Sequence, residues 1–322
     1  MSAVPSTSPL VAGRRRITDR FGDRVLEGIT AAAALLVALL LAAIAWKVFD
    51  IARPAISKFG FGFLVHQGWD VNKNVYAAFD FIWGTVLTSF VALAIAAPIS
   101  IAIALFLTEL APSSLRWLVT SLTELLAAVP SVVVGLWGIL VLGPFVAQHF
   151  EPWLHRWFGW IPLFSGSPQQ SGMLMAILVL TIMITPIVTS ICRELFLNVP
   201  NELRDGALAL GATRWEMVRG VVFPYTRSGI GAAMMLGLGR AVGEAIAVTQ
   251  VIGAGQGIHW SLFATGDTLA SRIAAQYQGA ANNLQIASLV YLAAILLVIS
   301  LLVNGAALWI VRRFSYERIG AD

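Results

Sequence analysis

The sequence predicts an all-α integral membrane protein with six transmembrane helices. Of its 322 residues, 58% are hydrophobic and only 12% are charged, and the mean hydropathy is +0.81. Soluble globular domains carry about 25% charged residues, so this composition is typical of a protein that lies in a bilayer. Six apolar runs are long enough to cross about 30 Å of hydrocarbon at about 1.5 Å per residue. They cover residues 26–48, 81–107, 118–147, 173–192, 229–254 and 284–311.

A polar segment precedes the first run. Residues 1–16 are rich in Ser and Pro and end in three arginines, so we expect a disordered cytoplasmic tail, followed by a short surface helix over 17–28. A cleaved signal peptide is the competing interpretation, because Ala43 and Ala45 resemble a cleavage site. We favour an uncleaved anchor, since the apolar run is longer than a typical signal-peptide core and the preceding segment is partly acidic.

The segments between the runs alternate between the two sides of the membrane. Residues 49–80 and 148–171 are expected outside, and the second segment contains tryptophans typical of a headgroup boundary. Pro130, in the third run, is expected to bend a continuous helix. With both termini inside, 14 of the 21 Lys and Arg residues lie on the inner side, in agreement with the positive-inside rule. The predicted parts are a cytoplasmic tail over 1–28, a transmembrane domain over 29–313 with an inner loop at 194–228, and a cytoplasmic tail over 314–322.

Composition also argues against several functions. The single cysteine, Cys192, cannot form an intramolecular disulfide or a cysteine-based metal site. None of the three lysines follows the glycine pattern of a nucleotide-binding phosphate loop. The net charge of +4 is spread over many short segments, which is typical of topology signals rather than of nucleic-acid binding. We therefore expect no catalytic residue, no metal and no cofactor in the chain itself, and no nucleic-acid partner.

The fifth run contains an ion pair. Arg240 lies about 12 residues into it, near the expected bilayer midplane, and Glu244 follows one helical turn later. A guanidinium at that depth must face protein or water and find a partner, which Glu244 supplies. We favour a role in an anion pathway, because the planar fork of arginine suits an oxyanion; a structural pair that fixes helix packing is the alternative. Gly239 and Gly243 have a spacing that allows another helix to approach closely.

Three further residues are candidates for the pathway. Thr185 lies in a stripe with Thr181 and Thr189, although helical threonines commonly bond to their own backbone. Ser131 can satisfy the carbonyl that the neighbouring proline frees. Glu124 lies about two turns from the inner end of the third run, and it either belongs to the pathway or reaches the cytoplasmic interface.

The inner loop at 194–228 carries charges of both signs and an amphipathic helical pattern. Gly211 is expected to end one short helix, Trp215 to begin another, and Pro224 to stop that helix before the next run. A charged face of this size is usually only solvated. The sequence of helix, glycine turn and helix nevertheless predicts a protruding element, called here the coupling knob (residues 200–224), that docks a soluble partner.

The coupling knob carries a family motif. The series Asp205-Gly206-Ala207, Gly211, Val221, Phe223 and Pro224 is similar, at every spacing, to the E-A-A-x-x-x-G-x9-I-x-L-P signature of ABC importer permeases. Asp replaces Glu, Gly replaces the first Ala, and Val and Phe replace Ile and Leu. The segments LLAAVPSVVVGLWGI, ALALGATRWEMV and GLGRAVGEAIAV narrow the resemblance to the permease of the phosphate-specific importer, the PstC type more than the PstA type. This resemblance extends from about residue 80 to the end.

The resemblance implies the type I permease fold of ABC importers, with both termini cytoplasmic, in the plasma (inner) membrane and surrounded by lipid. It implies a heterodimer with a second permease, two cytoplasmic ATPase subunits that bind ATP and Mg, and an extracytoplasmic phosphate-binding protein. The contact with the ATPase would fall on Glu202, Asp205, Gly206, Ala207, Gly211 and Pro224.

The function that follows is inward transport of inorganic phosphate by alternating access, driven by ATP hydrolysis on a partner subunit. An importer of another oxyanion, such as sulfate or molybdate, is the nearest alternative, since one arginine does not choose among tetrahedral anions. A secondary transporter or channel that acts alone is an alternative from another class, although no inverted repeat supports it. An accessory subunit that only scaffolds a complex is a third.

Overall fold

The computed structural model describes residues 17–314; the predicted tails over 1–16 and 315–322 lie outside the described residues. The chain divides into two units, residues 1–47 and 48–322, and each is described by itself. The described residues are mainly helical, with one two-stranded hairpin.

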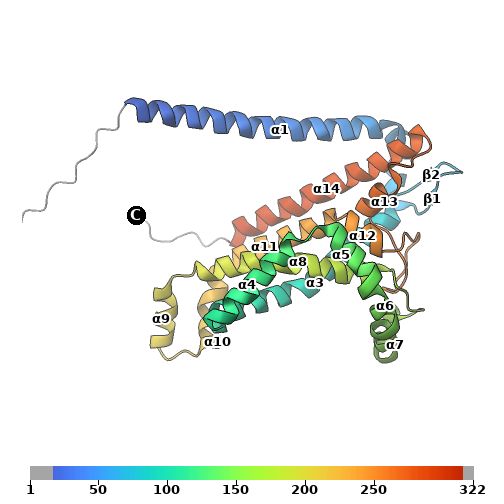
Figure 1. Cartoon of the computed structure of the whole chain (residues 1–322). Helices are drawn as coiled ribbons and strands as arrows, with labels where there is room; N and C mark the ends of the chain where they lie inside the picture. The colour runs from blue at the N-terminus through green and yellow to red at the C-terminus, as the bar shows by residue number, and fades with distance from the viewer. Residues whose placement is uncertain (1–16, 315–322) are drawn as a thin grey trace, which may run out of the picture. The chain divides into compact units, whose positions relative to one another are not determined.

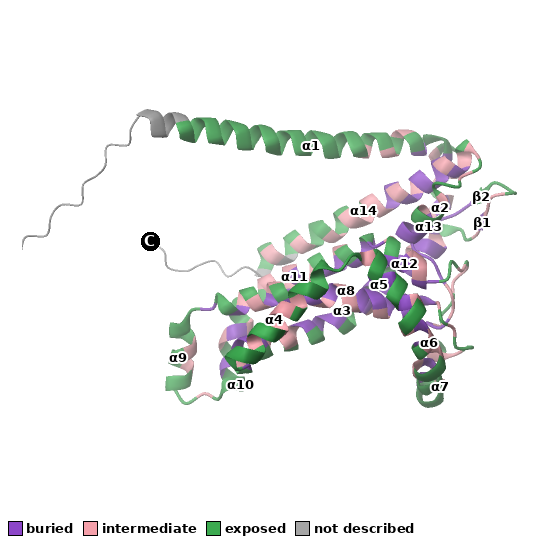
Figure 2. Ribbon diagram, in the orientation of Figure 1, coloured by how far each residue is buried: buried purple, intermediate pink, exposed green. Residues whose placement is uncertain are grey.

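In the first unit the main feature is α1 (Ile17–Phe59), a single helix whose last residues belong to the second unit. It begins at Ile17, so the expectation of a separate surface helix over 17–28 is wrong, because no proline lies in that stretch and the helix continues through Gly22 and Gly28. Residues 22–44 are all exposed within this unit (Figure 2). Uncovered apolar side chains of this kind are stable against lipid or another apolar helix, as expected of a membrane span.

The second unit begins with the end of α1, which extends to Phe59, and then has a short helix and a hairpin within the segment 49–80, for which an outer loop with some local structure was predicted. After α2 (Gly62–Val65), the strands β1 (Trp69–Asp70) and β2 (Val75–Tyr76) form an antiparallel hairpin. Asp70 Oδ1 accepts hydrogen bonds from the backbone N–H groups of Asn72 and Lys73 at 2.9 and 3.1 Å, which fixes the turn.

Four long helices form the bundle of the second unit: α3 (Phe79–Leu105), which the π-helical segment η1 (Phe106–Leu110) continues, α8 (Met173–Leu197), α11 (Phe223–Gly243) and α14 (Asn283–Phe314). In α8, 61% of the most apolar window is buried, against 33% in α3 and 39% in α14. Figure 2 shows the buried residues along α8, α3 and α12. A helix that is apolar on all sides lies at the centre of a bundle, and α8 takes that place.

The third predicted span is not one bent helix. The helix α4 (Ser113–Ala128) ends, Val129 is extended (ψ 128°), and a new helical run begins after Pro130. Proline disfavours the helical conformation of the residue before it. The helix therefore ends before Pro130, where only a bend was expected. The new run continues to Phe158, and therefore the expectation of an interfacial loop from residue 148 is also wrong. Its parts are α5 (Ser131–Trp137), η2 (Gly138–Leu142), α6 (Gly143–Phe145), η3 (Val146–Phe150) and α7 (Glu151–Phe158).

The fifth predicted span is broken as well. The helix α11 ends at Gly243 because Glu244 has an extended backbone (φ −72°, ψ 116°), and α12 (Ile246–Val251) follows. An irregular segment then leads to α13 (Leu269–Gln276) and α14. Among the described residues, five helices are long and apolar enough to cross a membrane, and α11 is not one of them. Its glycines and its two arginines reduce its hydropathy, so the number of six spans stays a prediction.

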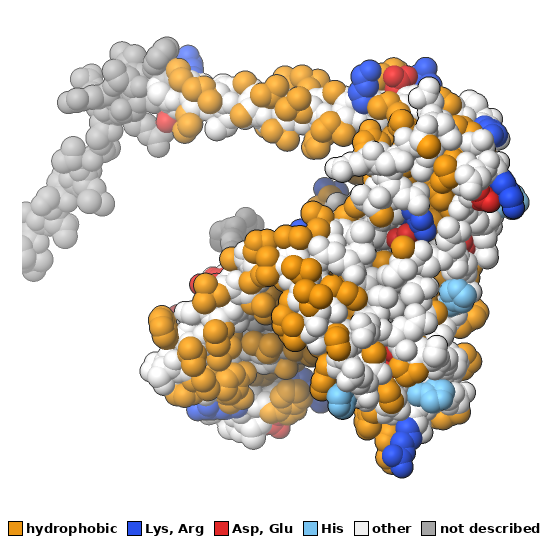
Figure 3. All heavy atoms as spheres, turned by 45° about the vertical axis from the view of Figure 1, so that its right-hand side comes forward, with side chains coloured by type: hydrophobic (Ala, Val, Ile, Leu, Met, Phe, Trp, Pro, Cys, Tyr) orange, Lys and Arg blue, Asp and Glu red, His pale blue; other side chains and the backbone are white. Residues whose placement is uncertain are grey.

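Two ends of the second unit carry different elements (Figure 1). The short helices α9 (Asn201–Ala209) and α10 (Arg214–Met217) and the π-helical segment η5 (Val218–Val222) lie at one end. The hairpin, α13 and the short helix η4 (Pro162–Phe164) belong to the other. Hydrophobic side chains cover a broad part of the visible face between them, and most charged side chains of that face lie near its margins (Figure 3). This distribution is typical of a protein that spans a bilayer.

Gly84 on α3 lies against the backbone of the segment before α13. A Cβ at this position would lie 2.0 Å from the carbonyl oxygen of Asp267, a backbone atom that cannot turn aside. We predict that Gly84→Ala lowers the free energy of unfolding by about 1–3 kcal/mol, as overpacking does, measured as a fall in the thermal unfolding midpoint of the detergent-purified protein. Gly305→Ala on α14 is the control, because nothing lies within 4 Å of its Cβ position. Equal midpoints for the two variants would contradict the close approach.

Candidate functional site

The ion pair predicted in the fifth run is present in the structure. Arg240 lies in the last turn of α11, and its Nη2 is 3.1 Å from Oε2 of Glu244. The two partners differ in exposure, since 49% of the Arg240 side chain is accessible against 5% of the Glu244 side chain. Glu244 is therefore fixed within the protein, whereas the guanidinium reaches from it into open space.

Glu244 also holds the start of α12. Its Oε1 accepts a hydrogen bond from the backbone N–H of Ala247 at 3.2 Å, and this N–H is one of those at a helix N-terminus that have no partner within the helix. The carboxylate thus carries out two tasks, one with each oxygen. A helix N-terminus also favours a negative charge, which adds to the stability of this arrangement.

Arg240 faces a cavity of about 320 Å³. The wall consists of the end of α4, the break after it, the first turn of α5 and the middle of α8. Arg240 is the charged residue among the described residues that line it; the others are Leu126, Ala127, Val129, Val134, Ile182, Met183 and Ile187. A cavity with one cationic fork and apolar walls is suited to an anion whose charge the guanidinium meets directly.

The first break lines this cavity, and the helices that follow the two breaks, α5 and α12, pack closely against each other. A Cβ on Gly135 of α5 would lie 2.7 Å from Cα of Ala247 and 2.4 Å from Oε1 of Gln250 on α12. Glycine thus allows the two helices to touch at backbone distance. The first turn of α5 and the first turn of α12 are brought to the same region as Arg240, which sequence reasoning did not predict.

The threonine stripe on α8 is used mainly within the helix. Thr181 donates to the carbonyl of Ile177, and Thr185 donates to that of Thr181, each at 2.7 Å, as the commoner role of helical threonine predicts. Thr185 and Thr189 nevertheless line a second cavity of about 150 Å³, which shares Leu126 with the cavity of Arg240. The two cavities are therefore neighbours along α4 and α8.

Two other pathway candidates lie elsewhere. Ser131 is the first residue of α5 and is half-buried, and Glu124 is exposed on α4. Neither lines one of the two cavities among the described residues. The structure thus brings together Arg240, Glu244 and, in the adjoining cavity, Thr185, but it does not place Ser131 or Glu124 with them.

Gly239 and Gly243 do not mediate a helix contact within the described part of the chain. No described atom lies within 4 Å of a Cβ built on either residue, apart from their own helix. The expected close approach occurs instead at Gly237, whose Cβ position is 2.8 Å from Val188 of α8. The glycine spacing was therefore a poor guide to the packing of α11.

The coupling knob has the predicted helix, glycine turn and helix. Gly211 ends the first helix with φ +88°, a conformation that side chains with a Cβ rarely adopt. Thr213 begins the second helix with a capping box, in which its hydroxyl accepts from the backbone N–H of Glu216 while the Glu216 carboxylate accepts from the backbone N–H and hydroxyl of Thr213. Trp215 is in the first turn of this helix.

Pro224 does not stop the second helix. The helical run continues from α10 through η5 into α11, and Pro224 lies in the first turn of α11. The prediction was wrong because the wider π-helical turn over Val218–Val222 precedes the proline and relieves the clash and the missing N–H that would end a regular helix. The knob and α11 are therefore continuous along one helical run.

The residues of the family motif lie on the surface of the knob. Ala207 is half-buried against the apolar cluster below, and the others are exposed: Glu202, Asp205, Gly206, Gly211 and Pro224. Their exposure leaves them accessible to a partner.

Two ion pairs, one half-buried and one buried, were not predicted from the sequence. Arg204 of α9 lies 3.2 Å from Glu109 of η1, and Arg272 of α13 lies 2.7 Å from Asp267. The first pair joins residues 95 positions apart, so no local spacing could have indicated it. Asp80 lies close to the second pair and accepts a backbone hydrogen bond from Gly257 at 3.1 Å, which fastens the segment before α13 to α3.

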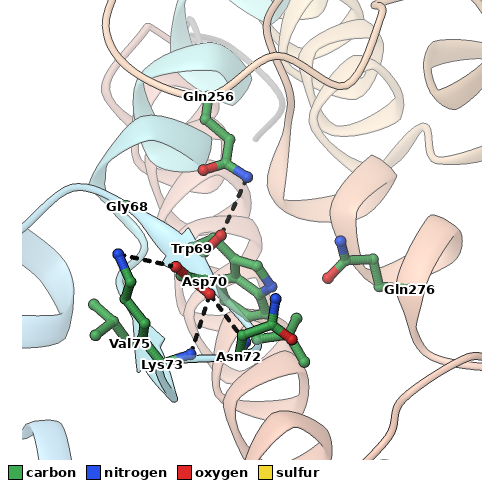
Figure 4. A pocket seen from close by; sticks show the side chains of 9 residues that line it. Gly68, Trp69, Asp70, Asn72, Lys73, Val75, Gln256 and Gln276 are labelled. Carbon is green, nitrogen blue, oxygen red and sulfur yellow. Dashed lines mark hydrogen bonds and ion pairs between the residues drawn. The ribbon is translucent and has the colours of Figure 1, made fainter.

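A third cavity, of about 560 Å³, opens beside the hairpin (Figure 4). Asp70 and Lys73 line it as an ion pair at 3.7 Å, and Gln256 donates to the carbonyl of Trp69 at 3.2 Å. Because the two charges compensate each other, this cavity lacks the unbalanced positive charge that attracts an anion. It was not predicted from the sequence.

The family of the chain follows from comparison with known proteins. Residues 96–316 match the family described as the binding-protein-dependent transport system inner membrane component. The chain belongs to this family. It is 42% identical to the phosphate transport system permease protein PstC of Mesorhizobium japonicum, with complete coverage of both chains, and 41% identical to PstC of Pasteurella multocida, with coverage of 92% and 95%. The resemblance to a PstC-type ABC importer permease is thereby confirmed, and the permease is an inner-membrane protein.

Solved structures support the same fold. A chain of the MetNI methionine ABC transporter in an inward-facing conformation has a TM-score of 0.54 at 20% identity, covering 73% of the permease and 95% of that chain. A chain of a bacterial ABC transporter for alginate has a TM-score of 0.54 at 19% identity, covering 91% and 100%. The all-α permease fold of ABC importers is therefore confirmed for this permease.

The double role of Glu244 leads to a stability prediction. Glu244→Ala removes both the ion pair and the acceptor for the Ala247 N–H, whereas Glu244→Gln retains a carbonyl oxygen that can accept that hydrogen bond. We expect Glu244→Ala to lower the free energy of unfolding by about 1 kcal/mol more than Glu244→Gln, the usual worth of a helix cap. Thermal unfolding midpoints of the purified permease measure the difference. Identical midpoints for the two variants would show that the carboxylate does not hold α12.

The capping box of α10 gives a pH dependence. The two hydrogen bonds from Thr213 lower the pKa of Glu216 below its usual value of 4.5. The ionised carboxylate thus stabilises the turn fully above pH 4.5, and this contribution is lost as the pH falls through the lower pKa of the folded state. We expect Glu216→Ala, which removes the acceptor for both Thr213 hydrogen bonds, to accelerate amide hydrogen exchange over residues 210–217 at pH 7. Glu194→Ala on α8 is the control, and equal exchange in the two variants would argue against the box.

Proposed function

We propose that this permease is the membrane subunit of an ATP-driven importer that moves inorganic phosphate into the cell by alternating access. Its relatives from Mesorhizobium japonicum and Pasteurella multocida, which cover 100% and 92% of the chain, carry the name phosphate transport system permease protein. The observation that carries the proposal is the guanidinium of Arg240, which faces a cavity between two broken helices. Irregular backbone at membrane depth is tolerated where it lines such a cavity, and broken helices of this kind form substrate sites in other transporters.

The pair with Glu244 gives the site two states. In the empty site the buried carboxylate neutralises the guanidinium, which removes the cost of an isolated charge. When phosphate arrives, its oxygens replace the carboxylate as acceptors for the fork of Arg240, which can form two parallel hydrogen bonds. Because half of the Arg240 side chain is exposed and Glu244 is fixed to α12, the arginine is the partner that moves. Thr185 lines the adjoining cavity further along the route, and its hydroxyl would have to leave the carbonyl of Thr181 to donate to the anion.

Each proposed partner is assigned to a different exposed surface of the permease. A second permease would cover the apolar side of α4, which has no buried residue in this chain. Two ATPase subunits, which bind ATP and Mg, would dock on the exposed residues of the knob: Glu202, Asp205, Gly206, Gly211 and Pro224, with Ala207 behind them. An extracytoplasmic binding protein would deliver phosphate at the opposite end, beside the hairpin (Figure 1). In this assignment the permease has no ATPase site of its own.

Uptake of radiolabelled phosphate tests the role of Arg240. In the assembled complex, Arg240→Ala is expected to reduce uptake by about tenfold to a hundredfold, because a charge-assisted hydrogen bond contributes about 1.5–3 kcal/mol. Arg240→Lys should retain part of the uptake, since it keeps the charge and loses the fork. Arg156→Ala removes an exposed arginine of α7 and is the control.

The same assay separates the alternatives. An excess of unlabelled sulfate or molybdate should leave phosphate uptake unchanged, and strong competition by either would identify another oxyanion as the substrate. Normal uptake by an assembled complex with Arg240→Ala would remove the arginine from the pathway.

A further inference from the structure

Arg204 connects the coupling knob to two helices of the bundle. Its Nη1 is 3.2 Å from Oε1 of Glu109 in η1, and its Nη2 donates to the carbonyl of Phe196 in the last turn of α8. Only 14% of the Arg204 side chain and 11% of the Glu109 side chain are accessible. A pair with so little solvent around it is weakly screened and fixed in position, unlike the exposed charges on the rest of the knob.

Glu109 in turn contacts both helices of the knob. Its carboxylate faces Arg204 of α9, and its backbone carbonyl accepts a hydrogen bond from Nη1 of Arg214 in α10 at 3.4 Å. The residue lies in η1, which continues α3 at its inner end. The end of α3 is therefore held by both parts of the knob.

The first helix of the knob has few other anchors. No residue of α9 is buried, and only Ala207 packs against the apolar cluster beneath it. The second part of the knob is different, because Met217, Val218 and Val222 are buried in that cluster with Phe196 of α8. The position of α9 relative to the bundle thus depends mainly on Arg204, whereas α10 and η5 are held by apolar packing.

The inner part of α3 leads to the smaller cavity. Ile103 of α3 lines this cavity together with Thr185, and Ser100 of α3 donates a hydrogen bond to the carbonyl of Thr185 at 3.1 Å. Ser100 lies nine residues before Glu109, a distance of about 14 Å along a helix. A displacement of Glu109 would therefore be passed by a short rigid helix to the wall of the cavity.

We propose that Arg204 and Glu109 are positioning residues that transmit the movement of the coupling knob to α3, in addition to the direct continuation of the knob into α11. The inference rests on the proposed function, since it assumes that an ATPase moves the knob. With the pair intact, a displacement of α9 pulls the ends of α3 and α8 together. Without it, the ATPase still docks on the exposed face of the knob and hydrolyses ATP, but α9 moves without α3.

The test compares transport with hydrolysis in the assembled complex reconstituted into lipid vesicles. Arg204→Gln and Glu109→Gln are each expected to raise the number of ATP molecules hydrolysed per phosphate transported by about tenfold, within the usual range of coupling between two sites. Arg204→Lys keeps the charge opposite Glu109 and should restore most of the coupling. A variant that only destabilised the complex would lower hydrolysis and transport together and leave the ratio unchanged.

Arg193→Gln is the matched control. Arg193 pairs at 3.1 Å with its neighbour Glu194 on the same helix, so its removal breaks an ion pair without separating two elements. The control should keep the ratio of the unmodified complex. An unchanged ratio for Arg204→Gln, or loss of the ATPase from the purified complex with that variant, would overturn the proposal, the second because the residue would then serve docking.

A second measurement is independent of the transported anion. Arg204→Gln is expected to accelerate amide hydrogen exchange over residues 201–209 in the assembled complex, while exchange over residues 217–222 stays as it is. Equal exchange over 201–209 in both proteins would refute the role of the pair as the anchor of α9. If the unmodified complex transports no phosphate, the proposed function fails, and the exchange comparison still decides whether the pair holds the knob.

Discussion

The two oxygens of the buried Glu244 carboxylate bind different elements, and the geometry around the Arg240 cavity depends on this division. One oxygen faces the guanidinium of Arg240 at the end of α11, and the other accepts the N–H of Ala247 at the start of α12. The extended backbone of Glu244 turns the chain between the two helices. A buried carboxylate without both partners would be costly, so the break, the ion pair and the cap stabilise one another.

The second break acts with the first. Val129 and Pro130 interrupt the chain between α4 and α5, and Gly135 then lets α5 approach the backbone of α12. Each break leaves backbone groups without helical partners, a state that lipid does not tolerate. The first break instead lines a protein cavity, and the last turn before the second break contributes the charged side chain of that cavity, Arg240. The backbone groups that have no helical partner therefore lie near a cavity, where a substrate could contact them, and not against lipid.

Sequence reasoning recovered the features that depend on composition and on local patterns. The membrane location follows from long apolar runs, the glycine turn of the knob from Gly211, and the ion pair from two charges one turn apart in an apolar run. The break at Glu244 was missed because an isolated glycine such as Gly243 occurs within membrane helices as well as at helix ends, and the local hydrogen bond from the Ala247 N–H to the Glu244 side chain has no distinctive sequence pattern. A proline in the sequence does not by itself show whether a helix ends. The helix ends before Pro130, whereas the helical run continues through Pro224 after a π-helical turn. The pair between Glu109 and Arg204 joins distant segments and had no local signal at all.

The π-helical segments η1 and η5 lie where the knob meets the bundle, one on each route by which its motion can spread. Along η5 the knob continues directly into α11, and Arg240 lies 26 residues after Arg214, about 39 Å along a helix. Along η1 the ion pair reaches α3 and the smaller cavity. A π-helical turn inside a helix is rare and often marks a functional site. In the proposed coupling, displacement of the knob therefore reaches α11 and α3 through one π-helical turn each, and these two helices contribute Arg240 and Ile103 to the two neighbouring cavities.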